Sequence, residues 1–239
     1  YGVTNMELTS AYASIANGGT YQKPVLYTKV VDHNGNILLS NTQKGKRVMK
    51  ESTAFLLTDA MKDVITKGTG KSAKLSSSMA VAGKSGTTSN SYDYWFSGYT
   101  PYHTASVWIG YDKNTNFASD NTHKKIWAKV MNEIIKTKQE HTTDFKKPAD
   151  IVKAKVCKES GKLAIKGVCD HDPRGSRVIT EYFEKGTVPT QTCDIHVAVE
   201  VCKTSDKLAT KNCPANKKQR KIYIVRKKGS HGKTTDTPY

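Results

Sequence analysis

The spacing of apolar residues along residues 1–137 predicts three helices. Apolar side chains recur every three to four positions in segments that begin after Thr4, cover residues 50–67 and include residues 126–135, as expected of helices with one buried face. Thr4 and Glu7 have the spacing of a capping box, in which each side chain accepts a hydrogen bond from the other residue's backbone N–H. Asn17 is followed by two glycines, which accept the backbone conformations that end a helix.

Segments rich in β-branched and aromatic residues predict antiparallel strands between these helices. Residues 24–31 and 37–39 flank an Asn34-Gly35 turn, the strongest local pattern for a β-hairpin. Residues 92–99 and 104–111 flank another short turn and are expected to pair in the same way. The order of elements indicates an α+β fold, in which helices pack on an antiparallel sheet. We expect the tryptophans to be packing residues: Trp95, Trp108 and Trp127.

Cysteine and charge are distributed unevenly, which indicates a second domain after residue 150. Residues 1–150 contain no cysteine and 19 Lys+Arg against 12 Asp+Glu, whereas the shorter remainder contains five cysteines and 19 Lys+Arg against 9 Asp+Glu. The polar segment between the two is typical of a linker. We therefore expect four parts: a first domain over residues 1–137, a linker over 138–150, a cysteine-containing β module over 151–225, and a basic tail over 226–239.

The formal net charge of +17 favours an anionic partner. Nucleic acid is not expected, because the sequence has no helix-turn-helix, no zinc-finger spacing and no aromatic RNA-binding pattern. Anionic wall polymer or lipid headgroups satisfy the same electrostatics, and solubility alone is the alternative. No apolar run reaches the roughly 18–20 residues of a membrane helix. Since the sequence has neither an initiator Met nor a signal-peptide pattern, we expect a piece of a longer chain or a processed form of it, with any address signal or anchor upstream.

Two Gly-Lys-Ser tripeptides resemble the end of a phosphate-binding loop. They begin at Gly70 and Gly83. A phosphate-binding loop has another glycine five positions earlier, where this chain has Ile65 and Ser78. It also needs a strand before the loop and a helix after it, whereas the first tripeptide follows a predicted helix and the second precedes a predicted strand. Nucleotide binding is therefore not expected.

The second tripeptide has another interpretation, as one wall of an acyl-transfer site on an edge strand. Lys84 supplies positive charge and can share protons with a neighbouring serine, and the Ser85 hydroxyl can bond a substrate carboxylate. Gly86 leaves room for a substrate backbone, and the N–H of Thr87 can face a developing oxyanion. On these residues alone, a surface turn between strands remains the simpler interpretation.

The context of this tripeptide closely resembles the transpeptidase domain of class A penicillin-binding proteins, over roughly residues 1–137. The matching runs keep the family's order without large gaps, which is far more specific than a single motif. They are YGVT at 1–4, AYA at 11–13, ANGG at 16–19, RVM at 47–49, TKGTG at 66–70, VAGKSGTTS at 81–89, DYWFSGYTP at 93–101 and VWIGYD at 107–112.

The resemblance implies a penicillin-binding, β-lactamase-like α+β fold and a serine-type D,D-transpeptidase. In this family a serine of a Ser-x-x-Lys motif attacks the penultimate D-Ala carbonyl of a peptidoglycan stem peptide, and β-lactams acylate the same serine. A Ser-x-Asn and a Lys-Thr-Gly motif complete the site. Here the third motif has Ser85 in place of Thr. The resemblance assigns catalytic roles to Lys84 and Ser85 and substrate binding to Gly86, Thr87 and Thr88, with no cofactor and no metal.

In this family the other two motifs precede the first helix, and in this sequence no Ser-x-x-Lys or Ser-x-Asn precedes Lys84. We therefore expect the C-terminal half of a transpeptidase domain plus an extension, with no acyl-transfer activity alone. The expected partners are the upstream half that carries the serine, stem peptides and β-lactams. The expected location is extracytoplasmic, on a bacterial surface, with a membrane anchor upstream. The alternative function is a non-catalytic, basic wall-binding segment of a degenerate penicillin-binding protein.

The cysteine module contains an internal repeat, because residues 156–169 and 201–213 match with a difference of one residue. Each copy is expected to form two short strands about a polar turn, with one cysteine on each arm. Disulfides of this loop size contribute about 2–3 kcal/mol to a small module. The repeat predicts the disulfides Cys157–Cys169 and Cys202–Cys213, leaves Cys193 unpaired and requires an oxidising, extracytoplasmic compartment.

A zinc site is an alternative for the same module. His171 lies two positions after Cys169, and His196 lies three positions after Cys193. This spacing fits no standard structural zinc pattern, and the repeat accounts for four cysteines without a metal. Disulfides are therefore the expectation from the sequence.

Overall fold

The computed structural model describes residues 2–141 and 143–225, and the predicted tail over 226–239 lies outside them. The chain divides into two compact units, Tyr1–Ala149 and Asp150–Tyr239. Each unit is described by itself. Among the described residues, no helix combines the length and the apolar character that crossing a bilayer requires.

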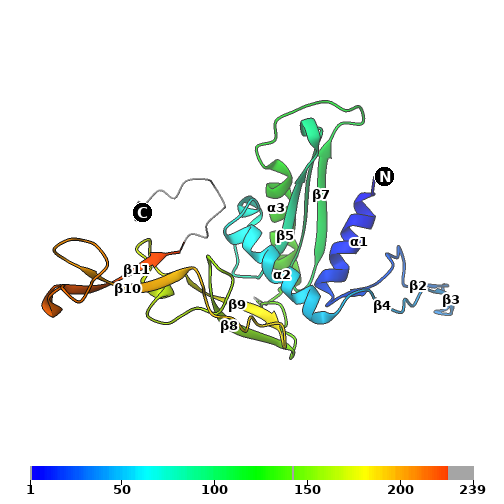
Figure 1. The fold of residues 1–239 in the computed structure, drawn as a ribbon. Coiled ribbons are helices and arrows are strands. Elements are labelled where there is room, and N and C mark those ends of the chain that lie inside the picture. Colours follow the sequence, from blue (N-terminus) through cyan, green and yellow to red (C-terminus); the bar gives the residue numbers. More distant parts are fainter. Residues whose placement is uncertain (1, 142, 226–239) are drawn as a thin grey trace. The chain divides into compact units, whose positions relative to one another are not determined.

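A three-stranded antiparallel sheet forms the centre of the first unit (Figure 1), in the order β5 (Ala82–Thr87), β6 (Asp93–Tyr99) and β7 (Thr104–Gly110). The strands β6 and β7 fall within one residue of their predicted bounds. Their register pairs Phe96 with Ser85 and Val107. Because side chains alternate between the faces of a strand, this register decides which residues share each face.

Three helices pack against this sheet: α1 (Asn5–Ala16), α2 (Glu51–Thr66) and α3 (Thr122–Lys138). Helix α1 lies on one face and α3 on the other, as Figure 1 shows. The predicted capping box of α1 is confirmed, since Thr4 and Glu7 bond each other's backbone N–H at 2.7 and 3.2 Å. The predicted α+β fold is thus confirmed.

The face of the sheet toward α3 carries the larger apolar core. Phe96 and Trp127 are fully buried, and their ring centroids lie 5.2 Å apart in an edge-to-face arrangement, which aromatic pairs prefer. The indole N–H of Trp127 donates to the carbonyl of Ala105 at 3.0 Å. Of the other two tryptophans, Trp108 is 38% exposed, so its predicted packing role is only partly met.

The opposite face holds a buried polar contact between Tyr99 and Thr58. The Thr58 hydroxyl donates to the carbonyl of Ala54 at 2.8 Å, so its oxygen accepts the hydrogen of the Tyr99 hydroxyl, which lies 2.7 Å away. Burial raises the pKa of Tyr99 well above its ordinary value. The folded state therefore keeps this phenol protonated at pH values where an unfolded chain loses the proton.

We expect Tyr99→Phe to lower the free energy of unfolding by about 0.5–1.5 kcal/mol at neutral pH, because one buried hydrogen bond is lost. The raised pKa means that the stability from Tyr99 is complete below about pH 10 and is lost as the pH rises above that value. The substitution should therefore also reduce the alkaline loss of stability. Urea unfolding at neutral and alkaline pH measures both effects.

Tyr102→Phe is the matched control for this prediction. Tyr102 is 47% exposed, and its hydroxyl donates only to the carbonyl of His141, at 3.3 Å. We expect a change within about 0.5 kcal/mol. Equal effects of the two substitutions would show that the Tyr99–Thr58 contact does not contribute.

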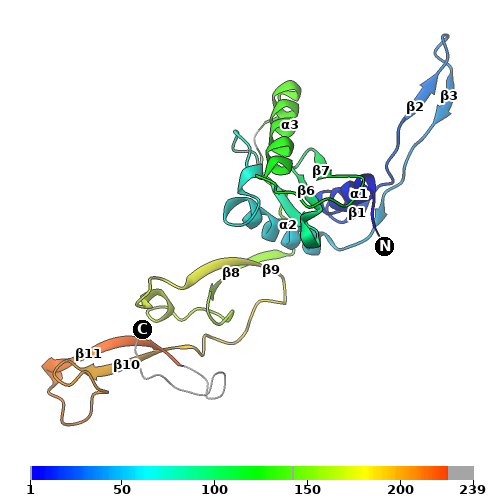
Figure 2. The ribbon, with the colours of Figure 1, turned by 90° about the horizontal axis from the view of Figure 1, so that it is seen from above.

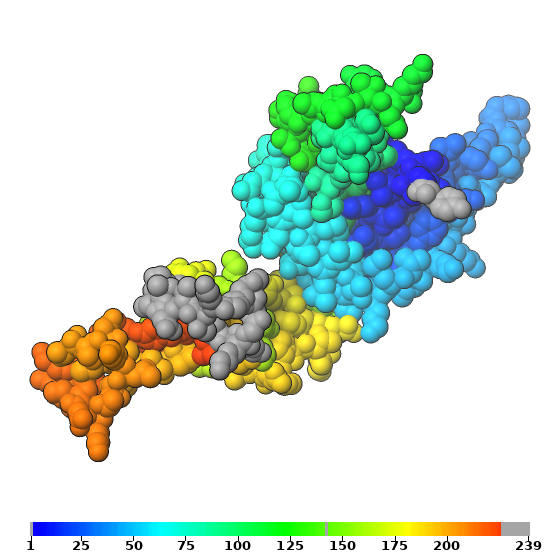
Figure 3. Space-filling model, turned by 45° about the horizontal axis from the view of Figure 1, so that its top comes forward, coloured from blue at the N-terminus to red at the C-terminus, as the bar shows by residue number. Residues whose placement is uncertain are grey.

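A hairpin extends from the first unit, as Figures 2 and 3 show in light blue. Its strands are β2 (Lys29–Val31) and β3 (Ile37–Ser40). The carboxylate of Asp32 accepts bonds from the backbone N–H groups of Asn34 and Asn36, both at 2.8 Å, and Gly35 has the positive φ of 85° that such a turn requires. Two further short strands, β1 (Thr20–Tyr21) and β4 (Lys46–Arg47), pair at its base.

The segment after α3, predicted to be a linker, packs against the first unit. The Asp144 carboxylate accepts bonds from the ammonium of Lys62 at 2.7 and 2.8 Å. The ring of Phe145 lies edge-to-face on that of Tyr99, with centroids 5.4 Å apart. These contacts make the segment part of the first unit up to Ala149.

Up to residue 225, where the described part of the second unit ends, it contains two antiparallel strand pairs. Strand β8 (Ile151–Cys157) pairs with β9 (Val178–Glu184), and β10 (His196–Cys202) pairs with β11 (Lys218–Ile224). The predicted repeat is visible in matching turns: the Cys157 N–H donates to the carbonyl of Lys162, and the Cys202 N–H donates to that of Lys207, both at 2.8 Å.

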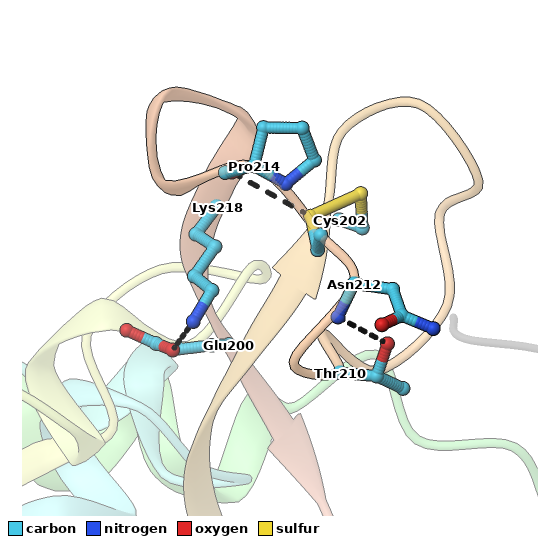
Figure 4. Close-up of a disulfide and its surroundings, with 7 residues drawn as sticks. Glu200, Cys202, Thr210, Asn212, Pro214 and Lys218 are labelled. Atoms are coloured by element: carbon cyan, nitrogen blue, oxygen red, sulfur yellow. Dashed lines mark hydrogen bonds and ion pairs between the residues drawn. A yellow bond between two sulfur atoms is a disulfide. The ribbon is translucent and has the colours of Figure 1, made fainter.

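The second copy of the repeat is closed by the predicted disulfide Cys202–Cys213 (Figure 4). The predicted disulfide Cys157–Cys169 is wrong, because both of these cysteines are free and buried. The repeat predicted one disulfide within each of its two copies. However, Cys193 lies beside the first copy and has no counterpart in the second. Its backbone N–H donates to the carbonyl of Leu163 at 2.8 Å, which holds Cys193 against the first hairpin.

Candidate functional site

The residues Lys84, Ser85, Gly86 and Thr87 lie on β5, an edge strand of the central sheet. Among the described residues, β5 pairs only with β6, so its other side is free. An unpaired strand edge presents backbone N–H and C=O groups that can bind an extended peptide. The sequence-based interpretation of Lys84-Ser85-Gly86 required this kind of edge.

The backbone groups of Ser85 and Thr87 point toward the free edge. The N–H of Thr88 donates to the carbonyl of Asp93 at 3.1 Å, across the β5–β6 pair. Because these groups alternate in direction along a strand, the N–H of Thr87 is directed away from β6. The Ser85 carbonyl has the same direction and accepts a bond from the Lys84 ammonium at 2.8 Å.

The side chains of Lys84 and Ser85 leave the strand toward opposite faces of the sheet. Ser85 shares its face with Phe96, its partner in the register. Its hydroxyl lies 2.9 Å from that of Thr69, in the loop after α2. This contact, which the sequence pattern did not predict, links the Thr-Lys-Gly-Thr-Gly run at 66–70 to the Lys84 motif.

Thr88 lies just beyond the end of β5 and is held by Asp93. Its hydroxyl donates to the Asp93 carboxylate at 3.0 Å and accepts a bond from the Asp93 N–H at 2.9 Å. The same carboxylate accepts a bond from the indole N–H of Trp108 at 2.8 Å. Thr88 therefore anchors the turn between β5 and β6, and its substrate-binding role stays a prediction.

A second lysine adds positive charge on the side of α3. Lys124 is only 7% exposed, and its ammonium donates to the side-chain oxygen of Asn121 at 2.7 Å. Burial lowers the pKa of Lys124, and the cation of Lys84 lowers it further. The charge of Lys84 thus acts on Lys124, and positive charge at this part of the sheet suits an anionic group such as a carboxylate.

A second cluster of chemically active groups lies in the other unit. The thiols of Cys157, Cys169 and Cys193 and the imidazole of His196 are buried, and their ligand atoms all lie within 4.8 Å of one another. The sequence did not predict this cluster, because its residues come from separate places that meet only in the folded unit. Cys157 ends β8, Cys169 begins the short 3-10 turn η3 (Cys169–His171), Cys193 lies in the loop before β10, and His196 begins β10. Of the two histidines considered, His171 is not part of the cluster.

Comparison with known families agrees with both units. Residues 1–136 match the family model described as the penicillin binding protein transpeptidase domain. Residues 147–198 match the model described as the penicillin-binding protein 1A, C-terminal domain. The first match covers more than half of the chain.

Curated relatives are similar along most of the chain. Penicillin-binding protein 1A of Clostridium botulinum is 36% identical over 231 residues, which are 94% of this chain and 27% of that protein. Penicillin-binding protein 2D of Bacillus subtilis is 33% identical over 227 residues, which are 91% of this chain and 31% of that protein. The chain thus spans less than a third of the length of these relatives.

A solved structure supports the fold. The crystal structure of penicillin-binding protein 1A from Haemophilus influenzae superposes with a TM-score of 0.63 at 23% identity, over 80% of this chain and 33% of that one. The order of the strands, the position of the Lys84 motif and the match over residues 1–136 lead to one conclusion: the chain belongs to the transpeptidase family of class A penicillin-binding proteins.

Proposed function

We propose that this chain supplies one wall of the active site of a peptidoglycan D,D-transpeptidase, whose nucleophilic serine lies upstream or on another chain. The observation that supports this most is the position of Lys84, Ser85, Gly86 and Thr87 on the free edge of β5, with the Thr87 N–H directed outward. A stem peptide that ends in D-Ala-D-Ala, or the β-lactam that resembles it, is the proposed ligand.

In the proposed reaction, the serine oxygen forms a bond to the carbonyl carbon of the penultimate D-Ala. The peptide C–N bond then breaks, and the terminal D-Ala leaves with the proton that the serine lost. The nitrogen of an amine on a second stem peptide then bonds to the same carbonyl carbon, the ester C–O bond breaks, and the amine proton returns to the serine oxygen, which completes the cross-link. The N–H of Thr87 is proposed to donate to the carbonyl oxygen as negative charge develops on it.

The side chains of Lys84 and Ser85 have separate roles in this proposal. The Lys84 ammonium provides positive charge and a proton donor near the reacting serine, and the positive field that it shares with Lys124 attracts the substrate carboxylate. The Ser85 hydroxyl, held by Thr69, bonds that carboxylate. Gly86 has no side chain, so the substrate backbone can approach β5 closely.

The proposed location is the outer side of the membrane, with an anchor in an upstream segment. The second unit carries a basic surplus, 19 Lys+Arg against 9 Asp+Glu over residues 151–239. Anionic wall polymer or anionic lipid is the partner that this charge favours.

We expect a fluorescent penicillin to label the full-length protein covalently and to leave the isolated 239-residue chain unlabelled, because no Ser-x-x-Lys motif precedes Lys84 in the chain. Gel fluorescence after denaturation measures the covalent label. Heat-denatured full-length protein is the control for non-specific reaction. A label on the isolated chain would place a nucleophile within it, and an unlabelled full-length protein would favour the non-catalytic alternative.

A further inference from the structure

The second unit brings three thiols and one imidazole to a single buried point. Cys157 and Cys169 are fully buried, Cys193 is 5% exposed and His196 is 4% exposed. None of the three cysteines forms a disulfide. We propose that these four residues bind one structural zinc ion, through three sulfur atoms and Nδ1 of His196.

The distances in the cluster suit a tetrahedral metal site. Nδ1 of His196 lies 3.3 Å from Sγ of Cys157 and 3.4 Å from Sγ of Cys193. Zn–S bonds of about 2.3 Å and Zn–N bonds of about 2.0–2.1 Å place nitrogen and sulfur about 3.6 Å apart at the tetrahedral angle. Shifts of a few tenths of an ångström thus place these two sulfurs and the nitrogen around one ion.

The other nitrogen of His196 is held by a buried carboxylate. Nε2 lies 2.8 Å from Oδ2 of Asp172, and both side chains are fully buried. Asp172 accepts two bonds from the guanidinium of Arg174, at 3.0 and 2.9 Å, so it is ionised and must accept the Nε2 hydrogen. A metal ion that takes the place of any proton on Nδ1 would then meet a lone pair directed at the sulfurs. A carboxylate that orients a histidine in this way is typical of metal sites.

Backbone N–H groups point at two of the sulfurs. The N–H of Ile165 donates to Sγ of Cys169 at 3.3 Å, and the N–H of His196 donates to Sγ of Cys193 at 3.5 Å. Hydrogen bonds to a charged acceptor are stronger than those to a neutral one. These donors therefore favour thiolates, the form in which cysteine binds a metal.

The second copy of the repeat has no counterpart of Cys193, so it is a natural comparison for the first copy. There, Cys202 and Cys213 form a disulfide with Cα atoms 6.0 Å apart. In the first copy, the backbone bonds between Leu163 and residues 191–193 bring Cys193 beside Cys157 and Cys169. A disulfide between any two of these three would leave the third thiol buried, whereas one zinc ion uses all three.

The kinds of ligand atom in the cluster indicate which metal binds there and what role the metal has. Three thiolates and one imidazole in a buried, tetrahedral arrangement are the ligands of structural zinc. Binding releases to solvent whichever protons the three thiols still carry and gives a complex with a net charge of −1. The zinc complex and the Asp172 carboxylate together carry two negative charges. The cations of Arg174 and Arg177 lie beside Asp172, and Nε of Arg177 is 3.8 Å from its Oδ1.

The test is the metal content of the chain. The reduced 239-residue chain is incubated with ZnCl₂, passed over a desalting column and analysed by mass spectrometry for zinc. We expect one zinc per chain, and tetrahedral cobalt–thiolate absorption bands when CoCl₂ replaces ZnCl₂. Peptide mapping of the unreduced chain should show Cys202–Cys213 as its single disulfide. Less than about a tenth of an equivalent of zinc, or a disulfide within the cluster, would overturn the proposal.

Variants separate a metal site from a packing cluster. Cys193→Ser and His196→Ala should each abolish zinc retention, with far-UV circular dichroism to report on folding. Asp172→Asn should retain one site with an affinity lower by about 10–100-fold, the usual effect of losing such a carboxylate. The double variant Cys202→Ser with Cys213→Ser is the matched control and should bind zinc as before. Loss of zinc in the control, or its retention in Cys193→Ser, would contradict the assignment.

Discussion

Replacing Lys84 by alanine in the full-length protein is expected to lower the second-order rate constant for acylation by penicillin by about 10²-fold or more. Loss of one electrostatic or proton-transfer group from an active site typically has an effect of this size. Lys84 lies on the edge strand β5, its ammonium donates to the outward carbonyl of Ser85, and it is the cation of the proposed wall. Stopped-flow or gel measurements with a fluorescent penicillin give the rate constant.

The chain contains a matched control for this prediction. Lys71 occurs in the other Gly-Lys-Ser tripeptide, but it lies on a short 3-10 turn, η1 (Lys71–Ala73), and not on the sheet. Lys71→Ala should leave the rate constant within about twofold, as expected for a surface substitution. If Lys84→Ala changed the rate constant no more than Lys71→Ala, the proposed active-site wall would be wrong.

The largest expected effect on stability is that of Trp127→Ala, which should lower the free energy of unfolding by about 3–5 kcal/mol. Trp127 is fully buried between α3 and the sheet. The substitution removes its contact with Phe96 and leaves the carbonyl of Ala105 without the indole donor. The resulting cavity lies in the core that fixes α3 against β6 and β7. Urea unfolding followed by far-UV circular dichroism measures the change.

Ile126→Ala is the control on the same helix. Ile126 precedes Trp127 but is 43% exposed, so its truncation should cost less than about 1 kcal/mol. Comparable losses for the two substitutions would mean that the loss reflects helix propensity and not the core contact. A loss below about 1 kcal/mol for Trp127→Ala would contradict the packing described here.

Local sequence patterns were sufficient to predict the three helices and the two larger hairpins of the first unit, but not the short strands β1 and β4. The spacing of Thr4 and Glu7 predicted the start of α1, because a capping box depends only on residues three apart. The Asn34-Gly35 turn predicted the β2–β3 hairpin for the same reason. The predicted strands 92–99 and 104–111 correspond to β6 and β7, since a short turn leaves them few other partners.

These local patterns could not predict contacts between residues that are far apart in the sequence. The bond between Thr69 and Ser85 and the packing of Phe145 on Tyr99 join segments that the sequence placed in separate elements. The segment around Phe145 is polar and resembles a linker, yet the Phe145 ring, the Asp144–Lys62 ion pair and the bond from the Ala80 N–H to the Thr143 carbonyl hold it on the first unit.

The cysteines are the clearest case in which the sequence predicted one contact correctly and another wrongly. The repeat correctly predicted Cys202–Cys213, because both residues lie on one hairpin and their distance depends on local geometry. The same argument was wrong for Cys157 and Cys169, because the chain returns after β9 and places Cys193 and His196 against them.

The sequence by itself determined the helices, the hairpins, the family and the position of the Lys84 motif along the chain. Only the tertiary structure decided that β5 is an edge strand with the Thr87 N–H directed outward, and that three cysteines and one histidine share a buried point. The physical reason is the separation along the sequence of the residues that interact. Caps, turns and apolar periods depend on residues a few positions apart. Strand order and contacts between side chains of different elements depend on how the whole unit packs.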